Sequence, residues 1–159
     1  MIEPFTKRDF DEAWTSFERF WPGRLSVRAL LHPVYLYQFG ETAYAVREGG
    51  ELIAYLLAFF SPAKPPEGYL HMVAVREDRR GRGLARVLYT HFEAEAQRRG
   101  AVALRAITTP GNAGSVAFHR RLGFELVDGG SREEGVPVVP DYAGPGQPRV
   151  VLVKRLEIV

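Results

Sequence analysis

The chain has 159 residues, of which 46% are hydrophobic, and it carries a formal net charge of +2 with no cysteine. This length supports a single domain with a substantial core, so we expect one domain over residues 1–159. The lack of cysteine excludes disulfides, thiolate metal ligands and a cysteine acyl-enzyme intermediate. So small a charge gives no argument by itself for binding to nucleic acid or to a membrane.

The sequence shows no pattern of a secretion signal or a membrane span. Residues 1–6 lack a basic region followed by an apolar one, as a signal peptide requires. The longest apolar run, 52–60, is too short to cross a bilayer. We therefore expect a cytoplasmic protein with no membrane partner.

Hydrophobic periodicity and turn residues predict the elements in chain order. The first half predicts a strand over 2–5, a helix over 9–20, an irregular helix over 25–37, and strands over 42–47, 52–60 and 69–75. The second half predicts a helix over 84–99, a strand over 101–107, a helix over 112–122, and strands over 124–127 and 149–156. Residues 128–148, rich in Gly and Pro, are expected to form a long excursion between the last two strands.

The most informative segment is the turn before the helix at 84–99. An apolar run, 70–75, meets four charged residues, 76–79, and then the residues Arg80-Gly81-Arg82-Gly83-Leu84-Ala85. Glycines let the backbone approach a ligand closely, and the start of a helix offers unpaired N–H groups and the positive end of its dipole. The pattern therefore predicts a phosphate site.

The order Arg80-x-x-Gly83-x-Ala85 resembles the signature of the GNAT superfamily, the acyl-CoA-dependent N-acyltransferases. The resemblance implies that the turn holds the pyrophosphate of acetyl-CoA. The residues it assigns there are Arg80, Gly81, Arg82, Gly83, Leu84 and Ala85. It also implies that Val73, Ala74 and Val75 lie on a central strand whose backbone pairs with the pantetheine arm.

A second block strengthens the resemblance. Residues 112–124 begin with Asn112 and end in Leu122-Gly123-Phe124, like a later helix of the same superfamily. The implied fold is α/β (α+β), a mixed sheet of six or seven strands flanked by helices on both faces. In this family the first 40 residues and the 128–148 excursion generally shape the acceptor site, so the acceptor is harder to predict than the cofactor.

Competing phosphate loops and a nucleic-acid patch fit the turn less well. A dinucleotide fingerprint would need glycine at position 86, which is Arg86, and no Gly-Lys-Ser/Thr of a Walker loop occurs. A nucleic-acid patch remains an alternative, but Glu77 and Asp78 interrupt it and no aromatic residue is interleaved for stacking. We expect no nucleic-acid partner and no metal.

Acetyl transfer to an amine needs a proton acceptor, an oxyanion donor and stabilisation of the leaving thiolate. The resemblance places the oxyanion donor in the backbone of 73–75. It places His119 where many members have a tyrosine that assists the thiolate. Asn112, Ser115 and His119 share one helix face, which would follow the pantetheine and the sulfur. The alternative is that His119 only packs under the cofactor.

Candidates for proton transfer are few. His71 shares a strand face with Val73 and Val75 and would act through water, or it is an ordinary core histidine. Tyr142 lies in the excursion and is a second candidate, the alternative being turn chemistry around it. Glu67, before the same strand as His71, has the pattern of a solvated turn residue.

A set of aromatic residues near the N-terminus would either wall an acceptor pocket or pack in the core: Trp14, Phe17, Phe20, Trp21, Tyr35 and Tyr37. The sequence thus predicts an N-acetyltransferase that uses acetyl-CoA and a small-molecule or amino-acid-like primary amine by direct attack. The alternative is a non-catalytic acyl-CoA-binding module of the same fold. A homodimer is compatible with this sequence.

Overall fold

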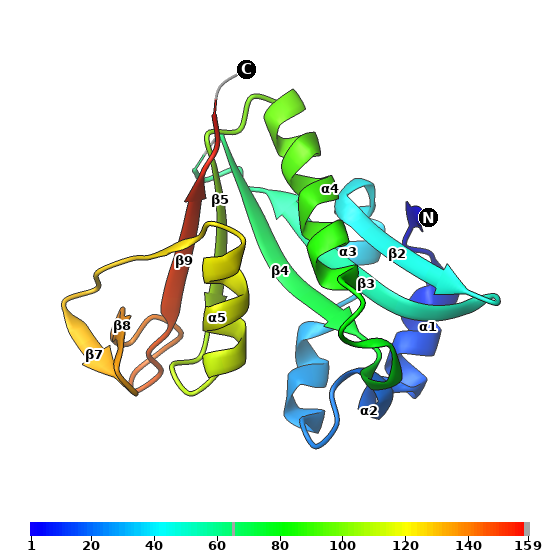
Figure 1. Cartoon of the computed structure of the whole chain (residues 1–159), viewed down its shortest axis with the longest axis horizontal. Coiled ribbons are helices and arrows are strands. Elements are labelled where there is room, and N and C mark those ends of the chain that lie inside the picture. Colours follow the sequence, from blue (N-terminus) through cyan, green and yellow to red (C-terminus); the bar gives the residue numbers. More distant parts are fainter. Residues whose placement is uncertain (65, 158–159) are drawn as a thin grey trace. The chain divides into compact units, whose positions relative to one another are not determined.

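The computed structural model describes residues 1–64 and 66–157. Seven strands form one mixed sheet in the order β1-β2-β3-β4-β5-β9-β6, and β7 and β8 form a second sheet of two strands (Figure 1). The chain divides into two compact units, one of residues 1–60 and 70–95 and the other of residues 61–69 and 96 onwards. The division passes through β4, whose first residues belong to the second unit.

The first unit contains most of the helices. Its elements are β1 (Ile2–Pro4), α1 (Lys7–Thr15), α2 (Phe17–Phe20), η1 (Leu25–Leu30), α3 (Val34–Tyr37), η2 (Gly40–Thr42), β2 (Ala43–Glu48), β3 (Glu51–Phe60), the end of β4 (Glu67–Val75), η3 (Glu77–Arg79) and most of α4 (Leu84–Arg98). Strand β2 pairs antiparallel with both β1 and β3. Gly49 and Gly50 both take positive φ, as the tight β2–β3 hairpin requires.

The predicted helix over 9–20 is two helices, which corrects the sequence prediction. Thr6 caps α1 by accepting from the Asp9 N–H, and Asp9 bonds back to the Thr6 N–H, a capping box. At the other end the Thr15 hydroxyl donates to the Asp11 carbonyl, and Ser16 leaves helical geometry with ψ 27°. The Thr15 hydroxyl competes in this way with the N–H donors of the helical backbone, and the helix is interrupted at Ser16.

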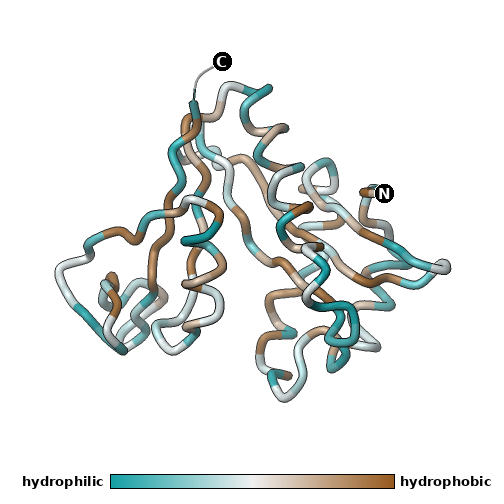
Figure 2. The backbone as a smooth tube through the Cα atoms, viewed as in Figure 1, coloured by the Kyte–Doolittle hydropathy of each residue, from teal (hydrophilic) through white to brown (hydrophobic). Residues whose placement is uncertain are grey.

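The core of the first unit lies on both faces of β3, whose residues 52–58 are all buried. On one face the Tyr55 ring packs 5.4 Å from the rings of both Phe5 and Phe20. Helix α4 packs against the strands through rings as well, with His91 at 4.7 Å from Tyr44 and Phe92 at 5.4 Å from Phe60. Figure 2 shows the contrast between this hydrophobic strand and the hydrophilic segment that joins β4 to α4.

The second unit is built around two long strands. Its elements are the start of β4, the end of α4, β5 (Ala103–Thr108), α5 (Ala113–Arg121), β6 (Glu125–Leu126), β7 (Ser131–Glu133), β8 (Val136–Val138) and β9 (Val150–Arg155). Strand β9 pairs antiparallel with β5 and with β6. Strand β4 pairs parallel with β5 at Glu67, Gly68 and Tyr69.

The Gly/Pro-rich excursion contains structure that the sequence did not predict. Strands β7 and β8 form a hairpin, and Val139 bridges to Arg149 beside β9. A Cβ at Gly129 would lie 2.2 Å from the Val138 carbonyl oxygen, so only glycine allows this close backbone approach. The predicted irregular helix over 25–37 is interrupted, because η1 ends at Leu30 and α3 begins at Val34, after Pro33. The other predicted strands and helices are present with ends shifted by a few residues. In the described ranges, no helix combines the length and apolarity that a membrane span needs.

Candidate active site

The turn between β4 and α4 has the backbone geometry that a phosphate site needs. Gly81 and Gly83 both have φ +75°, and a Cβ on either would meet no described atom within 4 Å. The first hydrogen bond of α4 runs from the Val87 N–H to the Gly83 carbonyl. The N–H groups of residues 84–86 precede it and therefore have no intrahelical acceptor. They are available, with the helix dipole, to an anion.

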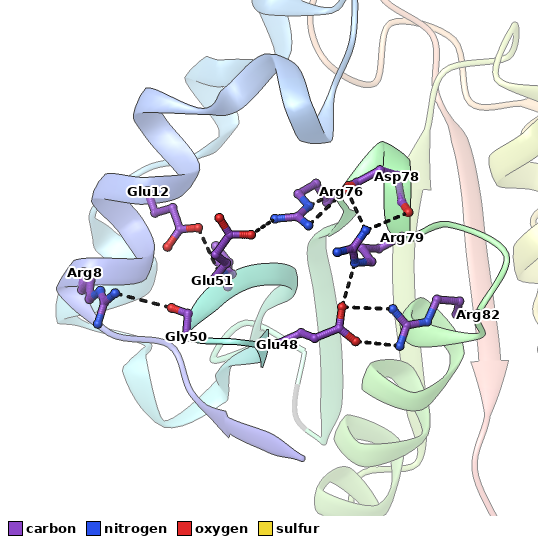
Figure 3. A network of polar contacts seen from close by, with 10 residues as sticks. Arg8, Glu12, Glu48, Gly50, Glu51, Arg76, Asp78, Arg79 and Arg82 are labelled. Atoms are coloured by element: carbon purple, nitrogen blue, oxygen red, sulfur yellow. Dashed lines mark hydrogen bonds and ion pairs between the residues drawn. The ribbon is translucent and has the colours of Figure 1, made fainter.

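Three arginines around this turn bind carboxylates of the protein itself (Figure 3). Arg76, only 2% exposed, donates to Glu51 at 2.8 Å and to Asp78 at 2.6 Å. Arg79 and Arg82 both bind Glu48, at 2.8 and 2.9 Å. Hydrogen bonds from Arg82 and Arg79 hold the pKa of Glu48 below its usual value. These arginine side chains brace the turn against the β2–β3 hairpin.

Two other arginines of the turn differ from these three. Arg80 donates to backbone carbonyls, those of Phe20 at 2.8 Å and Val75 at 3.3 Å. Arg86, in the first turn of α4, is exposed and has no hydrogen bond or ion pair with the described residues. Arg86 was not among the expected binding residues, because the sequence alone does not show which arginines the protein itself engages.

Strand β4 alternates as the sequence predicts. Leu70, Met72 and Ala74 are buried, whereas Val73 and Val75 on the other face are partly exposed. This pattern puts Met72 and Ala74 in the core of the first unit.

His71, on the same strand, has a defined tautomer. Its Nε2 lies 2.8 Å from the Leu30 carbonyl oxygen, and its ring stacks on Tyr35 at 4.1 Å. A carbonyl oxygen only accepts, so Nε2 carries the hydrogen and neutral His71 keeps a lone pair on Nδ1. Burial lowers the pKa of His71, and the nearby charge of His32 acts in the same direction, whereas the Leu30 hydrogen bond opposes it.

Helix α5 brings Asn112, Ser115 and His119 together, as their spacing predicts. The Asn112 side chain accepts from the Ser115 N–H at 3.1 Å and so caps the helix. The His119 Nδ1 lies 2.8 Å from the Ser115 carbonyl oxygen, and its ring meets Phe124 edge to face at 5.1 Å. His119 is 4% exposed, and this burial lowers its pKa, although the Ser115 hydrogen bond opposes the shift.

Tyr142 is 44% exposed and follows Asp141, which has φ +54°. The Asp141 carboxylate accepts from the Gly146 N–H at 2.7 Å and closes this turn. His119 and Tyr142 belong to the second unit and His71 to the first.

Glu67 is not the solvated turn residue that the sequence predicts. It begins β4 and forms a two-pronged ion pair with Arg105 of β5, at 2.9 and 3.0 Å. Hydrogen bonds to Glu67 raise the pKa of Arg105, although burial opposes the shift. The partners are 38 residues apart, and only the parallel β4–β5 register brings them together.

The N-terminal aromatic set divides between core and surface. Phe17 and Phe20 are buried in the core, with Trp21 and Tyr35 packed against it. Trp14 is 41% and Tyr37 63% exposed. The guanidinium of Arg28 lies 4.8 Å from the Trp14 ring centre, in a cation–π contact.

A family model described as the acetyltransferase (GNAT) family matches residues 8–124. An L-methionine sulfoximine/L-methionine sulfone acetyltransferase of Pseudomonas paraeruginosa is 38% identical over 81 residues, 48% of this chain and 46% of that protein. An L-2,4-diaminobutyric acid acetyltransferase of Marinococcus halophilus is 31% identical over 84 residues, 53% of this chain and 49% of that one. The matches thus span about half the length of these curated relatives.

Solved structures of low sequence identity share the fold. The ribosomal-protein-S18-alanine N-acetyltransferase of Escherichia coli superposes with a TM-score of 0.69 at 18% identity, covering 100% of this chain and 95% of that one. Ard1 of Thermoplasma volcanium gives a TM-score of 0.76 at 15% identity, covering 99% and 97%. With the family match over residues 8–124, the chain belongs to the GNAT family of acetyltransferases.

Proposed function

We propose that this protein transfers the acetyl group of acetyl-CoA to the primary amine of a small, amino-acid-like molecule. The observation that carries the proposal is the turn before α4, where Gly81 and Gly83 adopt positive φ with open space around them. The resemblance to the GNAT superfamily implies that such a turn holds coenzyme A. The curated relatives are named for methionine sulfoximine and diaminobutyric acid, which are amino acids with a free amine.

The reaction needs no covalent enzyme intermediate. The deprotonated amine nitrogen attacks the thioester carbonyl carbon, and the C–S bond breaks as the tetrahedral intermediate collapses. The nitrogen loses its proton to a base, and the thiolate of coenzyme A takes one up. We assign the oxyanion to a backbone N–H within Val73, Ala74 and Val75, because the resemblance places the thioester beside this strand.

His71 is the base that the geometry supports best. The Leu30 carbonyl holds its Nε2–H, so the lone pair of Nδ1 is the proton acceptor. The lowered pKa keeps the ring neutral at pH 7, as a base must be before the reaction. We propose that Nδ1 takes the proton of the amine through a water molecule.

Two side chains, His119 and Tyr142, are candidates for donating a proton to the leaving thiolate. Neutral His119 donates its only N–H to the Ser115 carbonyl, so we propose that it packs beneath the cofactor and that α5 orients Asn112 and Ser115. Tyr142 has a partly exposed phenol, whose O–H group is a hydrogen-bond donor. We propose Tyr142, or water, as the donor to the thiolate.

Release of free thiol from acetyl-CoA, followed against a panel of amino acids, polyamines, aminoglycosides and peptide N-termini, tests the activity. We expect turnover with an amino acid that carries a free primary amine. Thermal unfolding tests binding separately, because a ligand of the folded state raises the melting temperature. Coenzyme A should raise it, and NAD and ATP much less. A shift by coenzyme A with no thiol release across the panel would identify a non-catalytic acyl-CoA-binding module.

A further inference from the structure

Arg80 occupies the first position of the turn, and although it is exposed, its side chain bonds back to the protein backbone. Its Nη2 donates to the Phe20 carbonyl at 2.8 Å and its Nε to the Val75 carbonyl at 3.3 Å. Phe20 ends α2 and Val75 ends β4. One guanidinium therefore joins two elements that are far apart in the sequence at the point where the turn begins.

The acceptors distinguish Arg80 from the arginines beside it. Arg76, Arg79 and Arg82 bind carboxylates, so the charge of each is matched by an opposite charge. Arg80 instead donates to the neutral carbonyls of Phe20 and Val75, which need an N–H donor and not a cation. The Phe20 carbonyl lies in the last turn of a helix, where no intrahelical donor is available to it.

The position of Arg80 gives these bonds a role in the turn. Gly81 and Gly83, both at φ +75°, follow it directly, and its own N–H donates to the Glu77 carbonyl at 3.3 Å. Glycines at positive φ confer little rigidity of their own. The direction in which the N–H groups of residues 81–86 point is therefore set by what holds the residue before them.

We propose that Arg80 is a positioning residue for the coenzyme A turn: it fixes the turn to the ends of α2 and β4 through hydrogen bonds to uncharged carbonyls, and its charge is not required. The inference rests on the proposed function for the identity of the ligand, but the side-chain bonds themselves exist without ligand. It replaces the sequence expectation that the Arg80 side chain binds the pyrophosphate directly.

Two substitutions separate hydrogen bonding from charge. Arg80→Gln removes the charge and keeps an amide that donates two N–H bonds, whereas Arg80→Met removes both charge and donors at similar length. Arg86→Gln is the matched control, because it removes a charge from the same turn at a side chain with no partner among the described residues. Calorimetric titration with coenzyme A is done at two salt concentrations, about 50 and 200 mM, since phosphate contacts by cations weaken with salt.

We expect Arg80→Gln to bind coenzyme A within about threefold of wild type, with the same salt dependence. Arg80→Met should bind roughly 5- to 100-fold more weakly, as expected for two lost hydrogen bonds to carbonyl groups. Arg86→Gln should flatten the salt dependence. If Arg80→Gln binds as weakly as Arg80→Met and also flattens the salt dependence, the Arg80 charge contacts phosphate and the proposal is overturned.

Amide hydrogen exchange of the ligand-free variants tests the positioning role without coenzyme A. The N–H groups of Arg79 and Val87, which donate to the Arg76 and Gly83 carbonyls on either side of the glycines, should exchange faster in Arg80→Met than in wild type, and Arg80→Gln should restore protection. Equal protection in all three proteins would overturn the positioning role. If wild type fails to bind coenzyme A, the proposed function is wrong, and the exchange result still decides the inference about Arg80.

Discussion

The Nδ1 of His119 lies 2.8 Å from the carbonyl oxygen of Ser115, four residues earlier on α5. Because this oxygen only accepts, Nδ1 carries the hydrogen, and the Nε2 of the neutral ring has a lone pair. Burial lowers the pKa of the ring and so disfavours the doubly protonated form. The neutral ring has one N–H, and the Ser115 carbonyl already accepts it. His119 is therefore a poor proton donor for a thiolate.

Substitution of His119 by phenylalanine tests this conclusion. We expect kcat to stay within about threefold of wild type, below the roughly 100- to 10,000-fold that a positioned acid contributes. Any loss should appear in the dissociation constant of acetyl-CoA, because the change alters packing beneath the cofactor. Steady-state kinetics and calorimetry give both constants. A large fall in kcat with unchanged acetyl-CoA affinity, recovered in His119→Tyr, would instead make His119 the acid.

Stability should fall on mild acidification because two histidines, the buried His119 and the partly buried His71, are held neutral. The pKa of His71 and that of His119 are both lowered in the folded protein, chiefly by burial. Their unfolded value is about 6.5, so below that pH the unfolded chain binds more protons than the folded one. Their contribution to stability is therefore complete above about pH 6.5 and is lost as the pH falls through the folded values.

Calorimetric unfolding between about pH 8 and pH 5 measures this loss, in a range above the usual carboxyl pKa values. The double variant with His71→Gln and His119→Gln should have a flatter profile than wild type, with each single variant between them. An unchanged slope in the double variant would show that other groups cause the pH dependence.

The sequence predicted the turn before α4 well because its signals are local. Glycines at fixed positions between a strand and a helix determine backbone conformation, and the structure gives Gly81 and Gly83 the positive φ that the pattern suggests. The same holds for Asn112, which caps α5 through a residue three positions away. The interruption of the first helix at Ser16 also depends on neighbouring residues. The sequence predicted one continuous helix there because the amphipathic pattern is a stronger signal than the weak helix-breaking tendency of Thr15 and Ser16.

What the sequence could not predict depends on contacts between distant residues. Glu48 binds Arg82 over 34 positions, and Glu67 binds Arg105 over 38. A run of arginines therefore looks the same in the sequence whether the guanidinium groups are available to a ligand or already paired with carboxylates of the protein. Burial of His119 is likewise a tertiary property, since the ring packs against Phe124, which lies outside its helix.

Glu48 limits how far two arginines can contribute to anion binding. It holds both Arg79 and Arg82, so Glu48→Gln should release Arg82 and leave Arg79 paired only with Asp78. We expect coenzyme A to bind a few-fold more tightly, with a steeper dependence on salt. The melting temperature should change little, because exposed ion pairs contribute little to stability.

Glu125→Gln is the control for Glu48→Gln, since it removes the same charge from an exposed residue of the second unit. Titration with coenzyme A at two salt concentrations makes the comparison. Equal effects of the two substitutions would mean that net charge alone acts, and that Arg79 and Arg82 do not reach the ligand.

Gly83 gives the most direct test of the coenzyme A turn. Its φ is +75°, and a Cβ there would meet no described atom within 4 Å. Valine at this position strains the backbone by roughly 1–2 kcal/mol or more, because a branched side chain disfavours the left-handed region. The fold should survive this cost, but the added side chain would block the approach of phosphates to the N–H groups at the start of α4.

Gly100→Val is the matched control for Gly83→Val, with φ +73° and the same open space, just after the end of α4. Both variants should lower the melting temperature by similar amounts, because both force valine into the left-handed region. Only Gly83→Val should lose the calorimetric signal of coenzyme A binding. If Gly83→Val binds coenzyme A as wild type does, the pyrophosphate lies elsewhere. If both variants lose binding, general destabilisation and not the turn is responsible.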